Sequence, residues 1–222
     1  MFLHTHPYPP FINNDSTRLI VGTLPPPRFS MGLLKEGDVD FCYGSRDGQL
    51  WRILDRIYNL NLVYATTNEA IVQRKEFLIR EKIGICDIVE SATRQKIDAS
   101  DLGMNSVKMR NILGYLKEYP KVKTLLFTGG NSKNGPEYFF RKLLKEHGYS
   151  LTVKSDMVPR EHEFQFDDEL RVIQTISLTA PSGAANRAVG SLNSYKKIKS
   201  KNPFYNTFDF RVDQYRPFFI NT

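Results

Sequence analysis

Long hydrophobic runs and targeting features are missing from this sequence. No apolar stretch in its 222 residues approaches the roughly 20 residues that a membrane-spanning helix needs. The opening segment, MFLHTHPYPPF, has neither the basic flank nor the extended apolar core of a secretory signal peptide. We therefore expect a soluble, cytoplasmic protein that does not act at a membrane.

Cysteine and histidine are also scarce. Two cysteines, Cys42 and Cys86, are too few for a four-thiolate iron–sulfur cluster, and no disulfide is expected in a reducing compartment. The four histidines are scattered along the chain: His4, His6, His147 and His162. Their spacing fits no metal site, and the first two are more typical of a solvated terminal pair than of a chelate. We expect neither a metal nor another cofactor.

Acidic residues are absent between Leu170 and Phe208. The basic residues of that stretch are Arg171, Arg187, Lys196, Lys197, Lys199 and Lys201. These six charges nearly equal the net charge of +7 of the whole chain. Such a run is compatible with a solvated basic face, but clustered cations also suit a polyanionic partner through phosphate contacts.

Hydrophobic periodicity predicts strands that alternate with helices. Strands are expected at 18–22, 83–89, 122–127 and 172–178. Helices are expected at 50–58, 69–82, 107–119, 136–148 and 191–199, with one more in the aromatic tail after 202. This alternation favours parallel pairing. We predict one α/β domain over 1–222, a three-layer α/β/α sandwich whose central, mostly parallel sheet has about four or five strands.

Three of the predicted strands end in loops rich in Gly, Pro, Ser and Thr, after Val21, Phe127 and Ile176. Ligands of open α/β sheets bind outside the carboxyl ends of the strands. We therefore expect these loops to border one crevice. The polar segment 28–48 adds a long loop without periodicity, a feature that is often functional.

Two of these loops have a composition suited to binding. Gly22-Thr23-Leu24-Pro25 offers backbone amides in a loop that prolines hold rigid, although an ordinary strand–loop junction has the same features. The segment from Pro181 to Arg187, PSGAANR, combines small side chains with a hydroxyl, an amide and a cation. It is suited to gripping a phosphate backbone, or it is a helix-capping turn.

Together these segments resemble the motifs of the uracil-DNA glycosylase superfamily, in its mismatch-specific and hypoxanthine-type branch. GTLP followed by Trp51-Arg52-Ile53-Leu54 is similar to motif one, and Pro181-Ser182-Gly183 with Asn186 is similar to motif two. Residues 122–129 resemble the intervening strand. The match in order and spacing covers about residues 18 to 200.

The resemblance implies a DNA-repair enzyme that flips a damaged base into a pocket and hydrolyses its bond to the sugar. Residues implied to contact the base are Thr23, Leu24, Tyr43 and Thr128. Residues implied or expected to contact the DNA strand are Ser182, Gly183, Asn186, Arg187, Lys196 and Lys197. DNA is thus the expected partner, and we expect the protein to be a monomer.

Three positions depart from the family pattern. Gly48 stands where the hypoxanthine-type branch has a catalytic Asn, Leu24 where other branches place a polar catalytic residue, and Thr128 where a base-reading Asn occurs. Asp47, next to Gly48, is the candidate substitute that would hold a water and stabilise the sugar cation. Asp47 is equally compatible with a simple turn, since Asp-Gly pairs are common in turns.

Three hypotheses follow. The first is a monofunctional DNA glycosylase that removes uracil or hypoxanthine in base excision repair, with Asp47 as the catalytic residue. The second is a member of the same superfamily that binds nucleic acid or a nucleotide without cleaving it, because position 48 has no side chain. The third is a nucleotide or small-metabolite enzyme on the same scaffold, since fold alone does not fix function.

Overall fold

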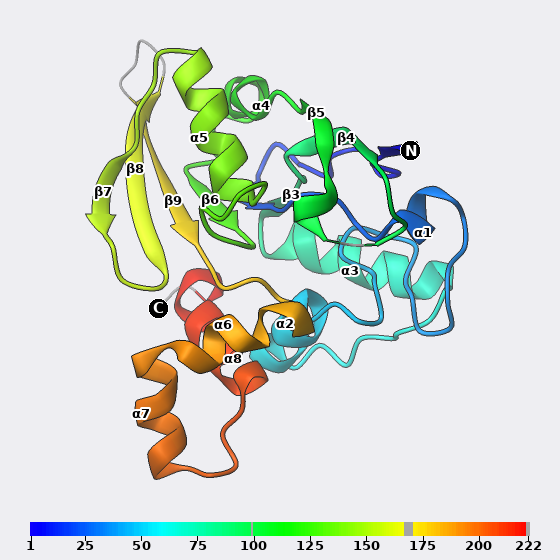
Figure 1. Cartoon of the computed structure of the whole chain (residues 1–222), viewed down its shortest axis with the longest axis vertical. Coiled ribbons are helices and arrows are strands. Elements are labelled where there is room, and N and C mark those ends of the chain that lie inside the picture. The colour runs from blue at the N-terminus through cyan, green and yellow to red at the C-terminus, as the bar shows by residue number, and fades with distance from the viewer. Residues whose placement is uncertain (99, 167–170, 221–222) are drawn as a thin grey trace.

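A computed structural model describes residues 1–98, 100–166 and 171–220. Its main element is a six-stranded sheet in which four neighbouring strands are parallel and the last two strands on one side pair antiparallel (Figure 1). The strand order is β3 (Ile83–Ile85), β2 (Arg18–Val21), β6 (Thr124–Phe127), β9 (Arg171–Ser177), β8 (Arg160–Phe166) and β7 (Thr152–Ser155).

A smaller antiparallel sheet of three strands lies beside the main sheet (Figure 1). It is built from β1 (Phe2–Thr5), β4 (Val89–Arg94) and β5 (Asn105–Met109). The chain enters this sheet directly after β3, so the segment between β3 and β4 links the two sheets. This connection brings the N-terminal segment and the β4–β5 region close to the carboxyl edge of the parallel strands.

Helices flank the main sheet. The α-helices are α1 (Pro27–Ser30), α2 (Leu50–Tyr58), α3 (Asn68–Arg80), α4 (Ile112–Glu118), α5 (Pro136–Glu146), α6 (Asn186–Ser191), α7 (Asn193–Lys201) and α8 (Thr207–Phe219). Two short 3-10 helices are η1 (Asp101–Gly103) and η2 (Gly183–Ala185). Side-chain caps define several starts: Thr67 accepts a hydrogen bond from the Ala70 amide at α3, and Asn206 forms a capping box with Asp209 at α8.

The core has two parts because successive side chains of a strand point to opposite faces of the sheet. In β6, Leu125 and Phe127 pack in a cluster with α4 and α5. Leu126, between them, packs in a second cluster with α2, α3 and α8. Each part buries large apolar side chains, such as Phe140 in the first and Trp51 in the second. This packing fixes the loops at the ends of the parallel strands.

The α/β class and the mostly parallel sheet agree with the sequence prediction, but the sheet has six strands rather than four or five. The additional strands form the β7–β8 hairpin. Its sequence REHEFQF in β8 is largely polar, although Phe164 and Phe166 are buried in the first core cluster.

Three predicted elements have different bounds in the structure. The strand expected at 83–89 is divided, because the chain leaves the main sheet after Ile85 and β4 belongs to the smaller sheet. The helix expected at 107–119 begins only at Ile112, where Asn111 accepts a hydrogen bond from the Gly114 amide, and 105–109 is strand β5. The helix expected at 191–199 is α7, shifted by two residues, and a further helix, α6, precedes it.

Some features are absent from the part of the chain that the structure describes. None of its helices is long and apolar enough to cross a bilayer. Within the same residues, no group of three or more His, Cys, Asp or Glu side chains is arranged to hold a metal ion. Cys42 and Cys86 are both buried free thiols.

Candidate functional site

Two adjoining cavities lie where the parallel strands end. The first has a volume of about 250 Å³ and is lined by residues 23–26, 43–45 and 47–50, with Asp87, Asp101, Thr128 and 180–182. The second, of about 330 Å³, lies between the loop 128–136, strands β8 and β9 and helix α6. The two share four lining residues, Thr23, Asp101, Thr128 and Ala180. The loops after Val21, Phe127 and Ile176 thus border a common crevice, as expected.

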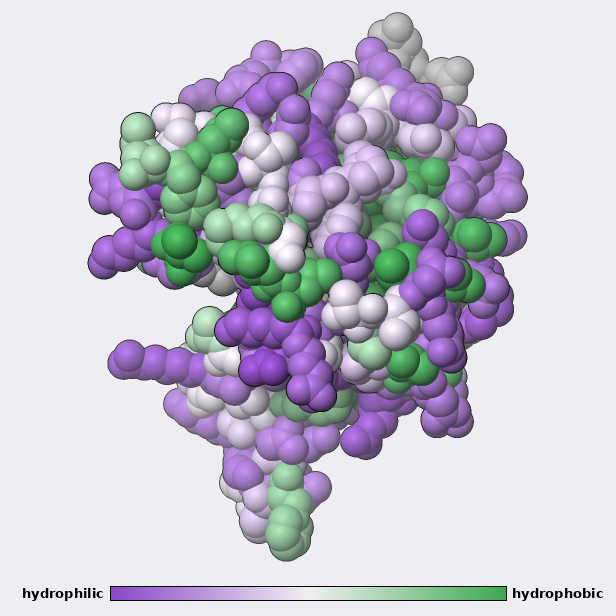
Figure 2. Space-filling model, turned by 90° about the vertical axis from the view of Figure 1, so that its right-hand side faces the viewer, coloured by the Kyte–Doolittle hydropathy of each residue, from purple (hydrophilic) through white to green (hydrophobic). Residues whose placement is uncertain are grey.

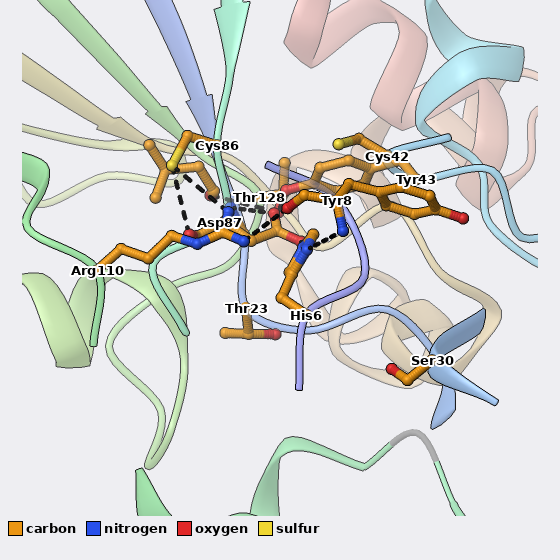
Figure 3. Close-up of polar contacts among 12 residues, drawn as sticks. His6, Tyr8, Thr23, Ser30, Cys42, Tyr43, Cys86, Asp87, Arg110 and Thr128 are labelled. Atoms are coloured by element: carbon orange, nitrogen blue, oxygen red, sulfur yellow. Dashed lines mark hydrogen bonds and ion pairs between the residues drawn. The ribbon is translucent and has the colours of Figure 1, made fainter. Parts of the chain in front are cut away.

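A fourth strand end contributes a residue that the sequence did not single out. Asp87 follows β3 and its buried carboxylate accepts a hydrogen bond from the Gly22 amide at 3.1 Å. Its other oxygen lies 2.9 Å from Nε2 of His6. Because the Tyr8 amide donates to Nδ1 of His6, the proton of this imidazole lies on Nε2 and points to Asp87 (Figure 3). Asp87 therefore positions the turn at Gly22.

Three side chains crowd above Gly22. A Cβ atom there would lie 2.0 Å from the Tyr43 hydroxyl and within 3.0 Å of Asp87 and Thr128. Tyr43 has a left-handed backbone, with φ of 58°, and its hydroxyl lies 3.0 Å from Oγ1 of Thr128 (Figure 3). Burial, reinforced by the charge of Asp87, raises the pKa of Tyr43 well above its ordinary value. Tyr43 is therefore a neutral phenol that helps to shape the first cavity.

A second carboxylate lies on the wall between the two cavities. Asp101, in η1, accepts a hydrogen bond of 2.7 Å from Oγ1 of Thr23. Burial raises the pKa of the Asp101 carboxyl to about 6, against the opposing effects of the Thr23 hydrogen bond and the charge of Arg94. Asp101 belongs to the region 95–104, whose sequence shows no periodicity and no motif, so nothing in the sequence pointed to it.

Asp47 lies at the edge of the first cavity. Its side chain is 71% exposed and forms ion pairs with Arg28 at 3.5 Å and Arg46 at 4.0 Å. Its neighbour Gly48 lines the same cavity through its backbone, which forms an isolated bridge with Ser182. Asp47 therefore faces solvent on the side of the cavity where the two loops meet.

Two other acidic residues of this loop, Asp38 and Asp40, have structural contacts. Asp38 is fully buried and accepts two hydrogen bonds of 2.8 Å from the Arg28 guanidinium. Although burial raises it, these bonds and those from the backbone amides of Arg46 and Lys35 hold the pKa of Asp38 at about 2. Asp40 accepts a hydrogen bond from the Tyr8 hydroxyl. Asp38 therefore stabilises the loop that carries Asp47.

A buried guanidinium holds the loop that carries Ser182. Arg211 of α8 donates to the carbonyl oxygens of Ala180 and Ser182, at 2.9 and 3.0 Å. It also donates to Oδ1 of Asn186 and to the carbonyl oxygen of Thr207. Oδ1 of Asn186 receives a second hydrogen bond, from the Thr207 hydroxyl. The oxygen of Asn186 therefore stabilises this loop, while the residue itself remains exposed.

No protein-family model matches this chain, and no curated protein matches its sequence. The solved structures that resemble it include a solution NMR structure from Methanosarcina acetivorans, described as a "putative Uracil DNA glycosylase". The similarity covers 95% of this chain and 99% of the other, with a TM-score of 0.54 and 17% sequence identity. The chain has a uracil-DNA-glycosylase-like fold.

In this glycosylase-like fold, most of the residues predicted to contact the DNA strand lie apart from those predicted to contact the base. The residues predicted to contact the base, Thr23, Leu24, Tyr43 and Thr128, all line the first cavity. Of those predicted to contact DNA, Ser182 lines this cavity, whereas Gly183, Asn186, Arg187, Lys196 and Lys197 are exposed on η2, α6 and α7. Helix α7 projects from the body of the molecule (Figure 1), and the corresponding lower end is largely hydrophilic on the face seen in Figure 2.

Proposed function

We propose that this protein is a monofunctional DNA glycosylase of the mismatch-specific or hypoxanthine-type branch. It would hydrolyse the N-glycosidic bond of a flipped uracil or hypoxanthine. The first cavity is the main support, since it lies between the Gly22–Pro25 and Pro181–Gly183 loops and is lined by all four residues predicted to contact the base. An extruded base needs such a pocket beside a surface that can hold the strand.

The predicted roles follow from these positions. Thr23, Leu24, Tyr43 and Thr128 would surround the base. Asp47, on the solvent side of the cavity, would orient a water and stabilise the cationic sugar. Ser182, Gly183, Asn186 and Arg187 would hold the strand near the extruded nucleotide, and Lys196 and Lys197 would contact its phosphates. We propose a cytoplasmic monomer whose whole chain forms one domain and whose partner is DNA, without a cofactor.

The direct test is base release from oligonucleotides that contain uracil, hypoxanthine or xanthine, followed by alkaline strand cleavage. We expect release from at least one substrate, and Asp47→Asn to lower it about 100-fold while DNA binding is retained, since general bases contribute at least that much. Glu36→Gln, on the same loop but away from the cavity, is the matched control. Absence of release from every substrate, single- or double-stranded, would contradict the proposed activity; full activity of Asp47→Asn would remove Asp47 from the mechanism.

The basic helix gives a second expectation. Replacing Lys196 and Lys197 with glutamine is expected to weaken DNA binding and to reduce the slope of log K against log salt by about two, because each phosphate contact releases about one counterion. Fluorescence anisotropy over a salt series measures both effects. The control replaces Lys117 and Lys145, exposed on α4 and α5 and outside both cavities. An equal effect in the two double variants would show only a loss of net charge.

One observation favours the alternative of a binding protein that does not cleave. At position 48 the chain offers only backbone to the cavity, and that backbone is engaged with Ser45 and Ser182. Salt-sensitive DNA binding without base release would support this alternative. Neither binding nor release would favour a nucleotide or small-metabolite enzyme on the same scaffold.

A further inference from the structure

We infer that the arm formed by residues 193–206 binds a single-stranded part of the DNA substrate, and that a base of this strand stacks on the ring of Phe204. The arm consists of α7 and the turn that follows it, and it projects from the body of the molecule (Figure 1). The inference rests on DNA being the partner in the proposed function. It adds a contact for bases to the phosphate contacts expected of the lysines on α7.

The Phe204 side chain is 91% exposed. Every other Phe, Tyr and Trp among the residues that the structure describes is buried or half-buried. Nearly the whole ring is therefore open to a ligand. Unstacked nucleobases bind such rings with little regard to sequence, because every base has a flat π-face.

An ordered turn presents this ring. Asn202 to Tyr205 form a β-turn, in which the Tyr205 amide donates to the Asn202 carbonyl oxygen at 3.0 Å. Pro203 occupies the second position, where proline suits such turns because its ring fixes φ. The Phe204 amide donates to the side-chain oxygen of Asn202. The Lys199 ammonium donates to the Pro203 carbonyl oxygen at 2.6 Å. The turn is thus ordered before a ligand binds, which lowers the entropy cost of binding.

A small apolar core fixes the arm to the rest of the molecule. Tyr205, next to Phe204 in the chain, is 8% exposed and packs with Val189 and Phe210 in a third core cluster. The Tyr195 ring of α7 lies 6.0 Å from the Tyr205 ring and 5.9 Å from the Phe210 ring, measured between centroids. Because this core already holds the arm through Tyr205, the exposed Phe204 ring is available for a ligand.

The surface around the turn is positively charged. Lys196, Lys197 and Lys201 are exposed on α7, and the sequence of the arm contains no acidic residue. Of the next acids in the chain, Asp209 caps α8 and Asp213 accepts a hydrogen bond from a tyrosine hydroxyl of the arm. One aromatic ring beside several cations suits a single strand, which offers phosphates and unstacked bases together. A protein partner would need a larger apolar patch, and the bases inside a duplex are already stacked on both faces.

The arm begins at the crevice. Leu192, directly before α7, and Ala188 and Val189 of α6 line the second cavity. Helix α7 has nine residues and is therefore about 14 Å long. At about 3.4 Å per nucleotide of a stacked strand, a strand that leaves the crevice along α7 would reach Phe204 about four nucleotides from the extruded base. The proposed contact thus has an expected position in the substrate.

Phe204→Ala tests the contact, because it removes the ring and keeps every lysine. We expect the affinity for a single-stranded uracil oligonucleotide to fall about tenfold, within the range for the loss of one stacked base, and the affinity for the same lesion inside a long duplex to change less than about twofold. The slope of log K against log salt should stay the same, since the ring contacts no phosphate. Ile79→Ala, an exposed apolar residue on α3 outside both cavities, is the matched control.

Fluorescence separates stacking from a merely structural role. Phe204→Trp keeps a ring at the turn and is expected to restore binding. Since the natural Trp51 is the only tryptophan of the chain and is 3% exposed, the new indole is the one in contact with solvent. Single-stranded DNA should quench its emission when one flank of the lesion is longer than about four nucleotides, and shorter flanks should not. Trimming the oligonucleotide from each end shows which flank lies on the arm.

The outcomes separate this inference from the proposed function. Equal binding of single strands by the wild type and Phe204→Ala, or no quenching in Phe204→Trp, would overturn the contact while the glycosylase proposal stands. Self-association that Phe204→Ala abolishes would assign the ring to a second copy of the chain and would also overturn it. If the wild type releases no base but the binding loss and the quenching are both observed, the glycosylase proposal fails and the arm remains a surface for single-stranded DNA.

Discussion

Replacing Gly22 with alanine is expected to disrupt the first cavity and to destabilise the fold. The added Cβ would lie 2.0 Å from the Tyr43 hydroxyl, 2.8 Å from Oδ1 of Asp87 and 2.9 Å from Oγ1 of Thr128. Tyr43 cannot simply rotate away, because it packs against the core cluster that contains Trp51. Overpacking at a buried site costs about 1–3 kcal/mol, and we expect the upper part of that range.

The loss of base-release activity should be larger than the lower stability alone would cause. The crowded side chains include Tyr43 and Thr128, which line the cavity, and a displacement of about 1 Å near a reacting group can lower a rate 100-fold. Urea unfolding and base release measure the two effects. Gly190→Ala is the control, since a Cβ at this half-buried position in α6 meets nothing within 4 Å and should raise stability slightly. Full activity of Gly22→Ala would show that the pocket tolerates the displacement.

Replacing Arg211 with methionine is expected to lower the free energy of unfolding by about 3 kcal/mol, because a hydrogen bond from a charged group contributes about 1.5–3 kcal/mol and each buried acceptor left without a donor adds a further cost. The Arg211 side chain is fully buried and donates four hydrogen bonds, three to carbonyl oxygens and one to Asn186. Methionine fills much of the same space but leaves these acceptors without a donor. Urea unfolding measures the loss, with an unchanged m-value as the check on two-state behaviour.

The same change should weaken DNA binding, because Arg211 holds the loop from Ala180 to Asn186 against α8. Arg216→Met, on the exposed side of the same helix, is the matched control and should alter both quantities little. Binding that is unaffected in Arg211→Met, once corrected for the unfolded fraction, would show that this loop does not need the anchor or does not contact DNA.

Much of the fold was predictable from local patterns. The helix Leu50–Tyr58 was predicted with its observed bounds, because its apolar side chains repeat with helical spacing and face one side. Strands β2, β6 and β9 were recognisable as short apolar runs that end in Gly, Pro or Thr. The β7–β8 hairpin was not predicted, because its half-polar strands lack the apolar run that identifies a central parallel strand.

The candidate site was predictable only in part. Thr23, Leu24, Tyr43 and Thr128 were proposed from the resemblance in motif order, and all four line one cavity. Asp87 and Asp101 could not be predicted in the same way. Asp87 comes from the connection between the two sheets and Asp101 from the connection between β4 and β5, and neither is part of a periodic pattern or a recognisable motif.

The sequence by itself determined the α/β class, the ends of three parallel strands and the loops that follow them. These are local properties, because hydrophobic spacing and the backbone limits of glycine and proline act over a few residues. Only the tertiary structure decided which carboxyl groups face the pocket. Thr23 and Asp101 are 78 residues apart, and Gly22 and Asp87 are 65 apart, yet each pair is joined by a hydrogen bond. The burial that raises the pKa of Asp101 comes from the packing of the smaller sheet and η1 against the loop after β2.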